Sequence, residues 1–138
     1  MTRTVRVLVA ESNPVARELL ANLLRMGGFD AMTADTGERA LAALRRERGA
    51  IDWLVTGIDL GGLTCGWVLA DEFRAHRPDH AVLFAVDRPD ATALGAEEAV
   101  FAGEAATPVD LLEILKWLCA EEARVEAETV NAEVAQAA

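Results

Sequence analysis

The sequence predicts an α/β fold, in which a parallel β-sheet is covered by helices on both faces. Short apolar runs rich in β-branched residues alternate with segments of helical periodicity, and this alternation repeats five times over about 115 residues. Neighbouring parallel strands need a long crossover connection, usually a helix, so this order favours a parallel sheet. Functional side chains in such sheets gather at the carboxyl ends of the strands. We therefore expect any site to lie there.

Composition and charge exclude several classes of protein. The chain has 138 residues, with 13 basic and 23 acidic side chains and a formal net charge of −10. A nucleic-acid-binding surface needs clustered Lys and Arg, so nucleic acid is not an expected partner. No apolar run reaches the roughly 20 residues of a membrane span. The two cysteines, Cys65 and Cys119, lie far apart and lack metal-ligand spacing. We expect a cytoplasmic protein with reduced thiols and no membrane partner.

The first strand and helix have clear local signals. Residues 5–10 form an apolar, β-branched run, and Asn13 is placed to cap a helix whose first residue is Pro14. Gly27-Gly28 ends that helix. Apolar residues repeat at helical spacing between these limits: Val15, Leu19, Leu23 and Met26.

A short strand over 31–33 leads into the second helix. Asp35, with Glu38 three residues later, resembles a capping box. The helix that follows carries three apolar residues on one face: Ala40, Leu41 and Leu44. The third strand is predicted over 51–56 and runs into a loop over 57–62.

The carboxyl-terminal half continues the alternation. A helix from about 66 to 76 ends before Pro78, and residues 81–86 form a continuous apolar strand. That helix presents Leu69, Ala70 and Phe73. Residues 87–106 are rich in Ala and Gly and poorly periodic. Thr107 is predicted to cap the last helix, with Asp110 at its third position.

Side chains on and before the last helix suggest what faces solvent. Its core-facing stripe is predicted to be Leu111, Ile114, Leu115 and Leu118. Leu112 and Trp117 fall to the side, where a Trp either covers the sheet edge or anchors a protein interface. His76 and His80 are interpreted as surface residues. The acidic, Ala- and Glu-rich tail over 121–138 either extends the helix or is disordered.

The order of these elements, together with their local sequences, resembles the receiver domain of two-component response regulators. Five stretches carry the resemblance: residues 7–20, 28–41, 52–62, 77–84 and 107–112. It implies a flavodoxin-like, doubly wound, five-stranded parallel sheet of order 2-1-3-4-5 with helices on both faces. It assigns residues 1–120 to a receiver-like domain and leaves 121–138 as a tail. It also makes the fourth helix, fifth strand and fifth helix the usual dimer and partner face.

The same resemblance implies five chemical groups at the strand ends. Two acids follow the first strand and help to hold magnesium, an Asp ends the third strand and accepts a phosphoryl group, a Ser or Thr ends the fourth strand, and a Lys precedes a Pro. The matching positions here are Glu11, Ser12, Gly57, Val86 and Thr107. Only Glu11 agrees, and Ser12 is better explained as part of a helix cap. Gly57 cannot form an acyl phosphate. Glu11 alone is a weak candidate magnesium ligand, so we expect no cofactor.

These substitutions favour a pseudo-receiver that is not an enzyme. It would act as a protein-interaction module in two-component signalling without being phosphorylated. Its partner would be a histidine kinase, a phosphotransfer protein, another regulator or a second copy bound through the last helix. Two alternatives remain open: residual phosphoryl acceptance at Asp59 or Asp87, and binding of a small ligand at the strand ends.

Overall fold

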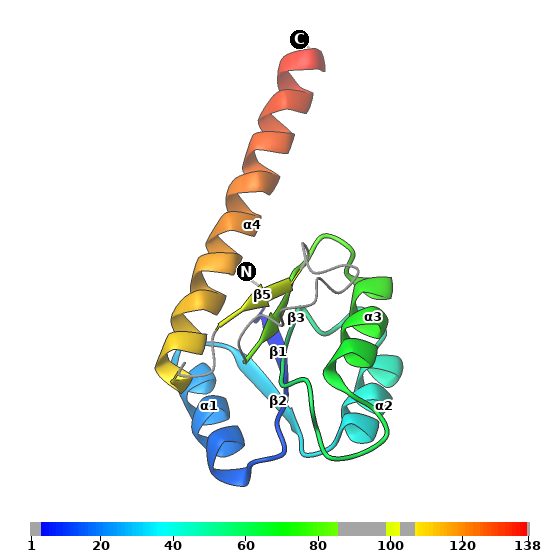
Figure 1. Cartoon of the computed structure of the whole chain (residues 1–138). Coiled ribbons are helices and arrows are strands. Elements are labelled where there is room, and N and C mark those ends of the chain that lie inside the picture. The colour runs from blue at the N-terminus through cyan, green and yellow to red at the C-terminus, as the bar shows by residue number, and fades with distance from the viewer. Residues whose placement is uncertain (1–3, 86–98, 103–106, 138) are drawn as a thin grey trace.

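The computed structural model describes residues 4–85, 99–102 and 107–137 of the chain. Within these ranges, strands alternate with helices from β1 to β4, and β5 then follows β4 in the order of described elements, before α4 (Figure 1). The strands are β1 (Arg6–Ala10), β2 (Asp30–Ala34), β3 (Trp53–Thr56), β4 (Val82–Phe84) and β5 (Ala99–Phe101). The helices are α1 (Pro14–Met26), α2 (Gly37–Glu47), α3 (Gly66–His76) and α4 (Pro108–Ala137).

The sheet has the predicted topology. Its order is β2-β1-β3-β4-β5, and all four pairings are parallel. The last residues of the five strands are register partners of one another: Ala34, Ala10, Thr56, Phe84 and Phe101. All five carboxyl ends therefore meet at one edge of the sheet, as the sequence predicted for the site.

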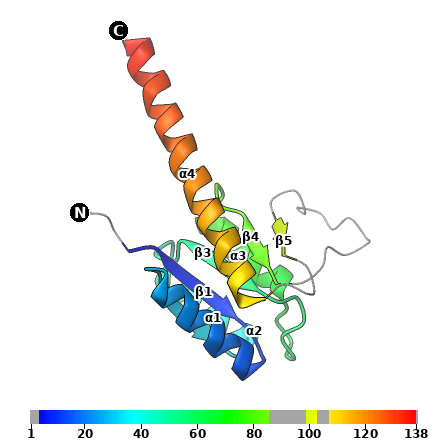
Figure 2. The ribbon, with the colours of Figure 1, turned by 90° about the vertical axis from the view of Figure 1, so that its left-hand side faces the viewer.

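Of the helices that the structure describes, two cover each face of the sheet. α1 and α4 lie on one face and α2 and α3 on the other, with the strands between them (Figures 1 and 2). Alternate residues of β1 serve the two cores, because Val7 and Val9 pack towards α1 and α4 while Leu8 and Ala10 pack towards α2 and α3. The prediction that helices cover both faces of the parallel sheet is confirmed.

Local signals placed most helix ends correctly. The Asn13 side chain accepts hydrogen bonds from the backbone N–H of Val15 and Ala16, at 2.9 and 3.1 Å, and Gly27 ends α1. At the start of α4, Thr107 Oγ1 accepts from the Asp110 N–H, and an Asp110 carboxylate oxygen accepts from the Thr107 N–H in return. α3 spans 66–76, as predicted.

The predicted cap of α2 is wrong by one residue. Thr36, not Asp35, is the N-cap, and its hydroxyl accepts from the Arg39 N–H at 3.2 Å. Asp35 instead pairs with the Arg39 side chain at 2.9 Å. The Glu38 side chain binds the loop before α3, as described below.

The apolar repeat predicted from the sequence of α1 is not the face that this helix buries. Val15 and Met26 are 75% and 82% exposed, and Leu19 is also exposed. The buried residues are Leu20, Ala21 and Leu24. Two overlapping apolar stripes run along this helix, and the stripe that packs is the one facing α4.

α4 is a single helix of 30 residues, about 45 Å long at 1.5 Å per residue. Its first part packs on the sheet beside α1, and its second part continues beyond the domain (Figure 2). The tail over 121–137 therefore extends the helix, which is one of the two predicted outcomes. None of the helices in the described part of the chain is both long and apolar enough to cross a membrane.

Leu112 is a correction to the predicted surface of α4. Only 8% of it is exposed, because α1 lies beside α4 and Leu112 packs into the core between them. Leu111, Leu115 and Leu118 are buried as predicted. Trp117 is 59% exposed, so this side chain does lie to the side of the core stripe.

Candidate functional site

A small hollow opens at the carboxyl ends of the strands, where the sequence predicted the site. We call it the strand-end crevice. It has a volume of about 190 Å³ and lies between β1, β3, the end of β4 and the first turn of α4. It is lined by Val9, Ala10, Glu11, Ala16, Leu20, Val55, Thr56, Gly57, Ala85, Pro108 and Leu111. Most of these side chains are apolar, and among the described residues Glu11 is the only formally charged group in the lining.

The structure brings together two of the five predicted positions. Glu11 and Gly57 both line the crevice, following β1 and β3. Thr107 lies just before Pro108 of the lining, and its hydroxyl is engaged with Asp110 at the start of α4. Ser12 is exposed, and the cap bonds described for α1 come from Asn13 instead. Val86 and Asp87 fall outside the described residues.

Gly57 leaves open space on the crevice side. A Cβ added there would meet only Leu60 Cδ2, at 3.7 Å, which is ordinary van der Waals contact. Thr56 before it is buried and donates its hydroxyl proton to the Gly57 carbonyl oxygen at 2.8 Å. The position could therefore hold a side chain, but the sequence supplies none.

Gly66 holds the other side of this loop in place. Its N–H donates to the Ile58 carbonyl oxygen at 2.8 Å, and an added Cβ would lie 2.0 Å from the Gly57 carbonyl oxygen. Real Cβ atoms do not approach a backbone oxygen so closely. The first residue of α3 and the loop after β3 therefore pack backbone against backbone, which only glycine allows.

Asp59 does not point its carboxylate at the crevice lining. It is exposed, and its Oδ1 accepts a hydrogen bond from the Gly61 N–H at 3.0 Å, so it forms a turn of its own loop. Glu38 fixes the same loop from α2, since its Oε1 accepts from the N–H groups of Leu63 and Thr64 at 2.8 and 3.0 Å. Hydrogen bonds from backbone N–H groups, including that of Glu38 itself, lower the pKa of the Glu38 carboxyl. Among the described residues, no three His, Cys, Asp or Glu side chains gather as metal ligands.

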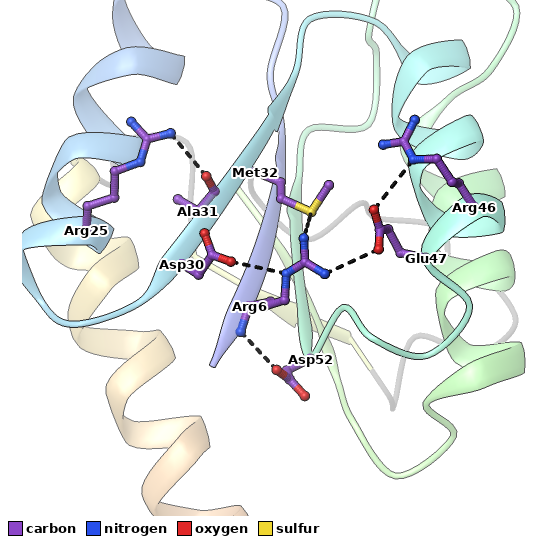
Figure 3. Close-up of polar contacts among 8 residues, drawn as sticks. All are labelled: Arg6, Arg25, Asp30, Ala31, Met32, Arg46, Glu47 and Asp52. Atoms are coloured by element: carbon purple, nitrogen blue, oxygen red, sulfur yellow. Dashed lines mark hydrogen bonds and ion pairs between the residues drawn. The ribbon is translucent and has the colours of Figure 1, made fainter. Parts of the chain in front are cut away.

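The opposite edge of the sheet carries a cluster of charged groups that links four elements. Arg6, at the start of β1, contacts Asp30 at 3.2 Å, Glu47 at 3.3 Å and the sulfur of Met32 at 3.0 Å (Figure 3). Its backbone N–H donates to Asp52 Oδ2 at 2.8 Å. Arg6 therefore joins β1 to β2, to α2 and to the residue before β3.

Asp52 is the buried centre of this edge. Only 4% of it is exposed, and its Oδ1 accepts from Arg77 Nη2 at 2.9 Å. Arg77 Nη2 also donates to the Gly49 carbonyl oxygen at 2.6 Å. The carboxylate thus holds the connection between α3 and β4 against the start of β3. The buried role of Asp52 was not predicted from the sequence, although a single Asp inside an otherwise apolar run indicates a buried carboxylate.

His80 is buried, contrary to the prediction that it lies on the surface. It is 5% exposed, and its ring stacks on Trp53 with centroids 4.2 Å apart. Nδ1 faces the Asp52 carbonyl oxygen, and Nε2 lies 2.7 Å from Glu122 Oε1. The contact ties α4 to the sheet. His76 is exposed, as predicted.

Cys119 lies half-buried on α4 near the same cluster, and both cysteines are free thiols, as expected. Burial, followed by the negative charges of Glu122 and Asp52, raises the pKa of the Cys119 thiol from 9.0 to about 11. At neutral pH the thiol is protonated, which makes it a poor nucleophile.

The raised pKa of Cys119 makes stability fall in alkaline solution. Below pH 9 the thiol is protonated in both states, and between pH 9 and about 11 only the unfolded thiol ionises. The free energy of unfolding should therefore decrease as the pH rises through this window. Urea unfolding of wild type and of Cys119→Ala checks this, because the variant should lose that part of the slope. Parallel curves for the two proteins would contradict it.

Comparison with known proteins identifies the fold. No model of a known protein family matches the chain, and no curated protein does so either. Among solved structures, it is similar to a response regulator receiver protein from Sinorhizobium medicae, with a TM-score of 0.75 and 20% identity over 84% of this chain and 94% of that one. It is also similar to a response regulator receiver protein from Pseudomonas putida, with a TM-score of 0.68 and 26% identity over 84% and 98%. The chemotaxis response regulator CheY4 of Vibrio cholerae matches with a TM-score of 0.71 and 18% identity over 84% and 99%.

Proposed function

We propose that this chain, which has the fold of response regulator receiver domains, serves two-component signalling as a pseudo-receiver that binds a protein partner without being phosphorylated. One observation carries the proposal. Gly57 directly follows β3 and lines the strand-end crevice, at the place where receivers present their phosphoacceptor Asp. A glycine has no side chain to accept a phosphoryl group. A phosphoryl group needs a carboxylate there to form an acyl phosphate.

The rest of the crevice supports the same conclusion. Magnesium is usually bound by one or two carboxylates together with phosphate and water, and in the part of the crevice lining that the structure describes Glu11 is the one carboxylate. Thr107, at the place of the receiver Lys, is engaged with Asp110 in the cap of α4 and brings no positive charge. An arriving phosphoryl group would find neither its usual acceptor nor the usual neutralising charge.

The partner in this proposal is a histidine kinase, a phosphotransfer protein or another regulator. Such a partner can shift the domain only between conformational states that it binds with different affinities. Without a phosphoryl group, it must recognise those states through the surface of the domain. Trp117 supports α4 as part of that surface, because an exposed Trp is a favoured anchor of protein interfaces. Dimerisation through α4 is the alternative use of the same side chain.

Intact-mass spectrometry after incubation with acetyl phosphate and magnesium tests the proposal. We expect the wild-type mass to stay unchanged, while a phosphorylatable receiver treated alongside gains a phosphoryl group. Gly57→Asp is the matched variant, because the added Cβ meets only Leu60 Cδ2 at 3.7 Å and the fold should persist. A phosphoryl group gained by Gly57→Asp but not by wild type would assign the loss to this position.

A stable phosphoryl gain by the wild type would overturn the proposal. It would favour the alternative of a displaced acceptor, and Asp59→Asn and Asp87→Asn would then locate the group. The turn that Asp59 forms with Gly61 argues against its use as an acceptor. Binding of a small ligand has less support, because the crevice is smaller than the 300 Å³ or so of an ordinary ligand pocket.

A further inference from the structure

A larger hollow lies at the other edge of the sheet, between the connection from α3 to β4 and the second part of α4. Its volume is about 960 Å³. We call it the α4 groove. Its apolar lining includes Trp53, Leu118 and Val125, and its charged lining includes Asp79, Glu121 and Glu126. Trp53 begins β3 and His80 precedes β4, so the groove lies at the amino-terminal edge and away from the strand-end crevice.

The apolar residues of the groove are not fully covered by the fold. Val125 and Val130 are 50% and 56% exposed, and both line the groove with Leu118. Leu118 and Val125 are seven residues apart, so they lie on one side of α4, two turns from each other. A helix segment that leaves its domain lacks the packing that normally stabilises helices in water. A partner seated in the groove would supply that packing.

The charges of the groove favour a basic partner. Four carboxylates line it: Asp79, Glu121, Glu122 and Glu126. Of the basic lining residues, Arg77 is paired with the buried Asp52, His80 is paired with Glu122, and His76 is exposed. Among the carboxylates, Glu121 pairs with Arg124 of the same helix at 3.0 Å. The tail over 121–138 holds five Glu and one Arg, so a second copy of the chain would place like charges together. Charge complementarity therefore selects a basic segment of another protein.

The groove is preformed rather than assembled by its occupant. Glu122 of α4 is held by His80, which stacks on Trp53, and Arg77 is held by Asp52. These contacts join both walls to the sheet. A binding site that is already ordered loses less conformational entropy when it is occupied.

We propose that the α4 groove binds a basic amphipathic segment of a protein partner. Its apolar side chains would pack on Leu118, Val125 and Val130, and its Lys or Arg side chains would face Asp79, Glu121 and Glu126. This inference shares with the proposed function only the premise that the ligand is a protein. It names a surface distinct from the crevice, and the phosphorylation experiment does not bear on it.

The test is fluorescence anisotropy with a labelled synthetic helix whose polar face is all lysine and whose apolar face is all leucine. The wild-type chain should bind this peptide, more weakly as salt rises, and should not bind the matched peptide with glutamate in place of lysine. Glu126→Lys should weaken binding about tenfold. Val125→Asp should weaken it as well, by placing a charge on the apolar floor.

Glu128→Lys is the control, because it makes the same change of charge on an exposed position of the same helix outside the groove lining. It should change the affinity less than about threefold. Equal losses in Glu126→Lys and Glu128→Lys would overturn the proposal, since the peptide would then follow net charge alone. Binding of the glutamate peptide, or self-association of the wild type that Val125→Asp abolishes in sedimentation, would also overturn it. Circular dichroism confirms that each variant is folded.

Discussion

Replacing Gly66 by Ala is expected to lower the free energy of unfolding by about 3 kcal/mol or more, at the upper end of the cost of overpacking. The added Cβ would lie 2.0 Å from the Gly57 carbonyl oxygen, and neither atom belongs to a flexible side chain. α3 and the loop after β3 would have to move away from each other. That movement would break the hydrogen bond from the Gly66 N–H to the Ile58 carbonyl oxygen. Ala is otherwise favoured over Gly in a helix, so the loss would come from the clash.

Gly57→Ala is the matched control for this prediction. The two glycines face each other across the same contact, but a Cβ at position 57 meets only Leu60 Cδ2, at 3.7 Å. Its stability should stay within about 0.5 kcal/mol of the wild type. Urea unfolding followed by circular dichroism measures both variants. Equal stabilities for Gly66→Ala and Gly57→Ala would show that the loop adjusts freely, against the close packing described here.

Replacing Asp52 by Ala should cost about 3 kcal/mol of stability, at the lower end for a broken buried pair, because it removes a buried carboxylate while the Arg77 side chain it compensates is 25% exposed. Asp52 is 4% exposed and accepts hydrogen bonds from the Arg6 N–H and from Arg77 Nη2. Without the carboxylate, the Arg77 guanidinium keeps its place beside the core with its main anionic partner removed. Thermal and urea unfolding should both register the loss.

Asp30→Ala provides the comparison, because Asp30 also pairs with Arg6 but is exposed. Its side chain is 53% accessible and the pair is 3.2 Å long. An exposed ion pair contributes at most about 1 kcal/mol, so the variant should lose little stability. A loss as large as that of Asp52→Ala would contradict the assignment of the buried carboxylate as the centre of this edge.

Helix starts were predictable from the sequence where their chemistry is local. Asn13 before Pro14, and Thr107 with Asp110, make hydrogen bonds within three residues, so the spacing alone specifies the cap. The position of the crevice was predictable for a different reason. Residues that follow parallel strands meet at one edge whatever their identity, which brought Glu11 and Gly57 together.

The errors concern contacts between elements far apart in the chain. The exposed Val15 and the buried Leu20 both fit a helical repeat, and only the position of α4 decides which of them packs. Leu112 is buried for the same reason, because α1 lies beside it. His80 has an ordinary local sequence, but its partner Glu122 is 42 residues away. No local periodicity or cap could indicate that pair.

The position of α4 on one face of the sheet has a consequence for how the chain folds during synthesis. β1 and α1 are made first, yet their apolar face is completed by Leu111, Leu115 and Leu118 near the other end of the chain. Until that helix leaves the ribosome, Val7, Val9 and Leu24 lack the part of their cover that α4 supplies. The layer formed with α2 and α3 has a shorter delay, since its strands and helices in the described part of the chain, β5 excepted, lie within residues 6–84. The nascent domain should therefore consolidate one side early and keep the other incomplete until α4 has been made.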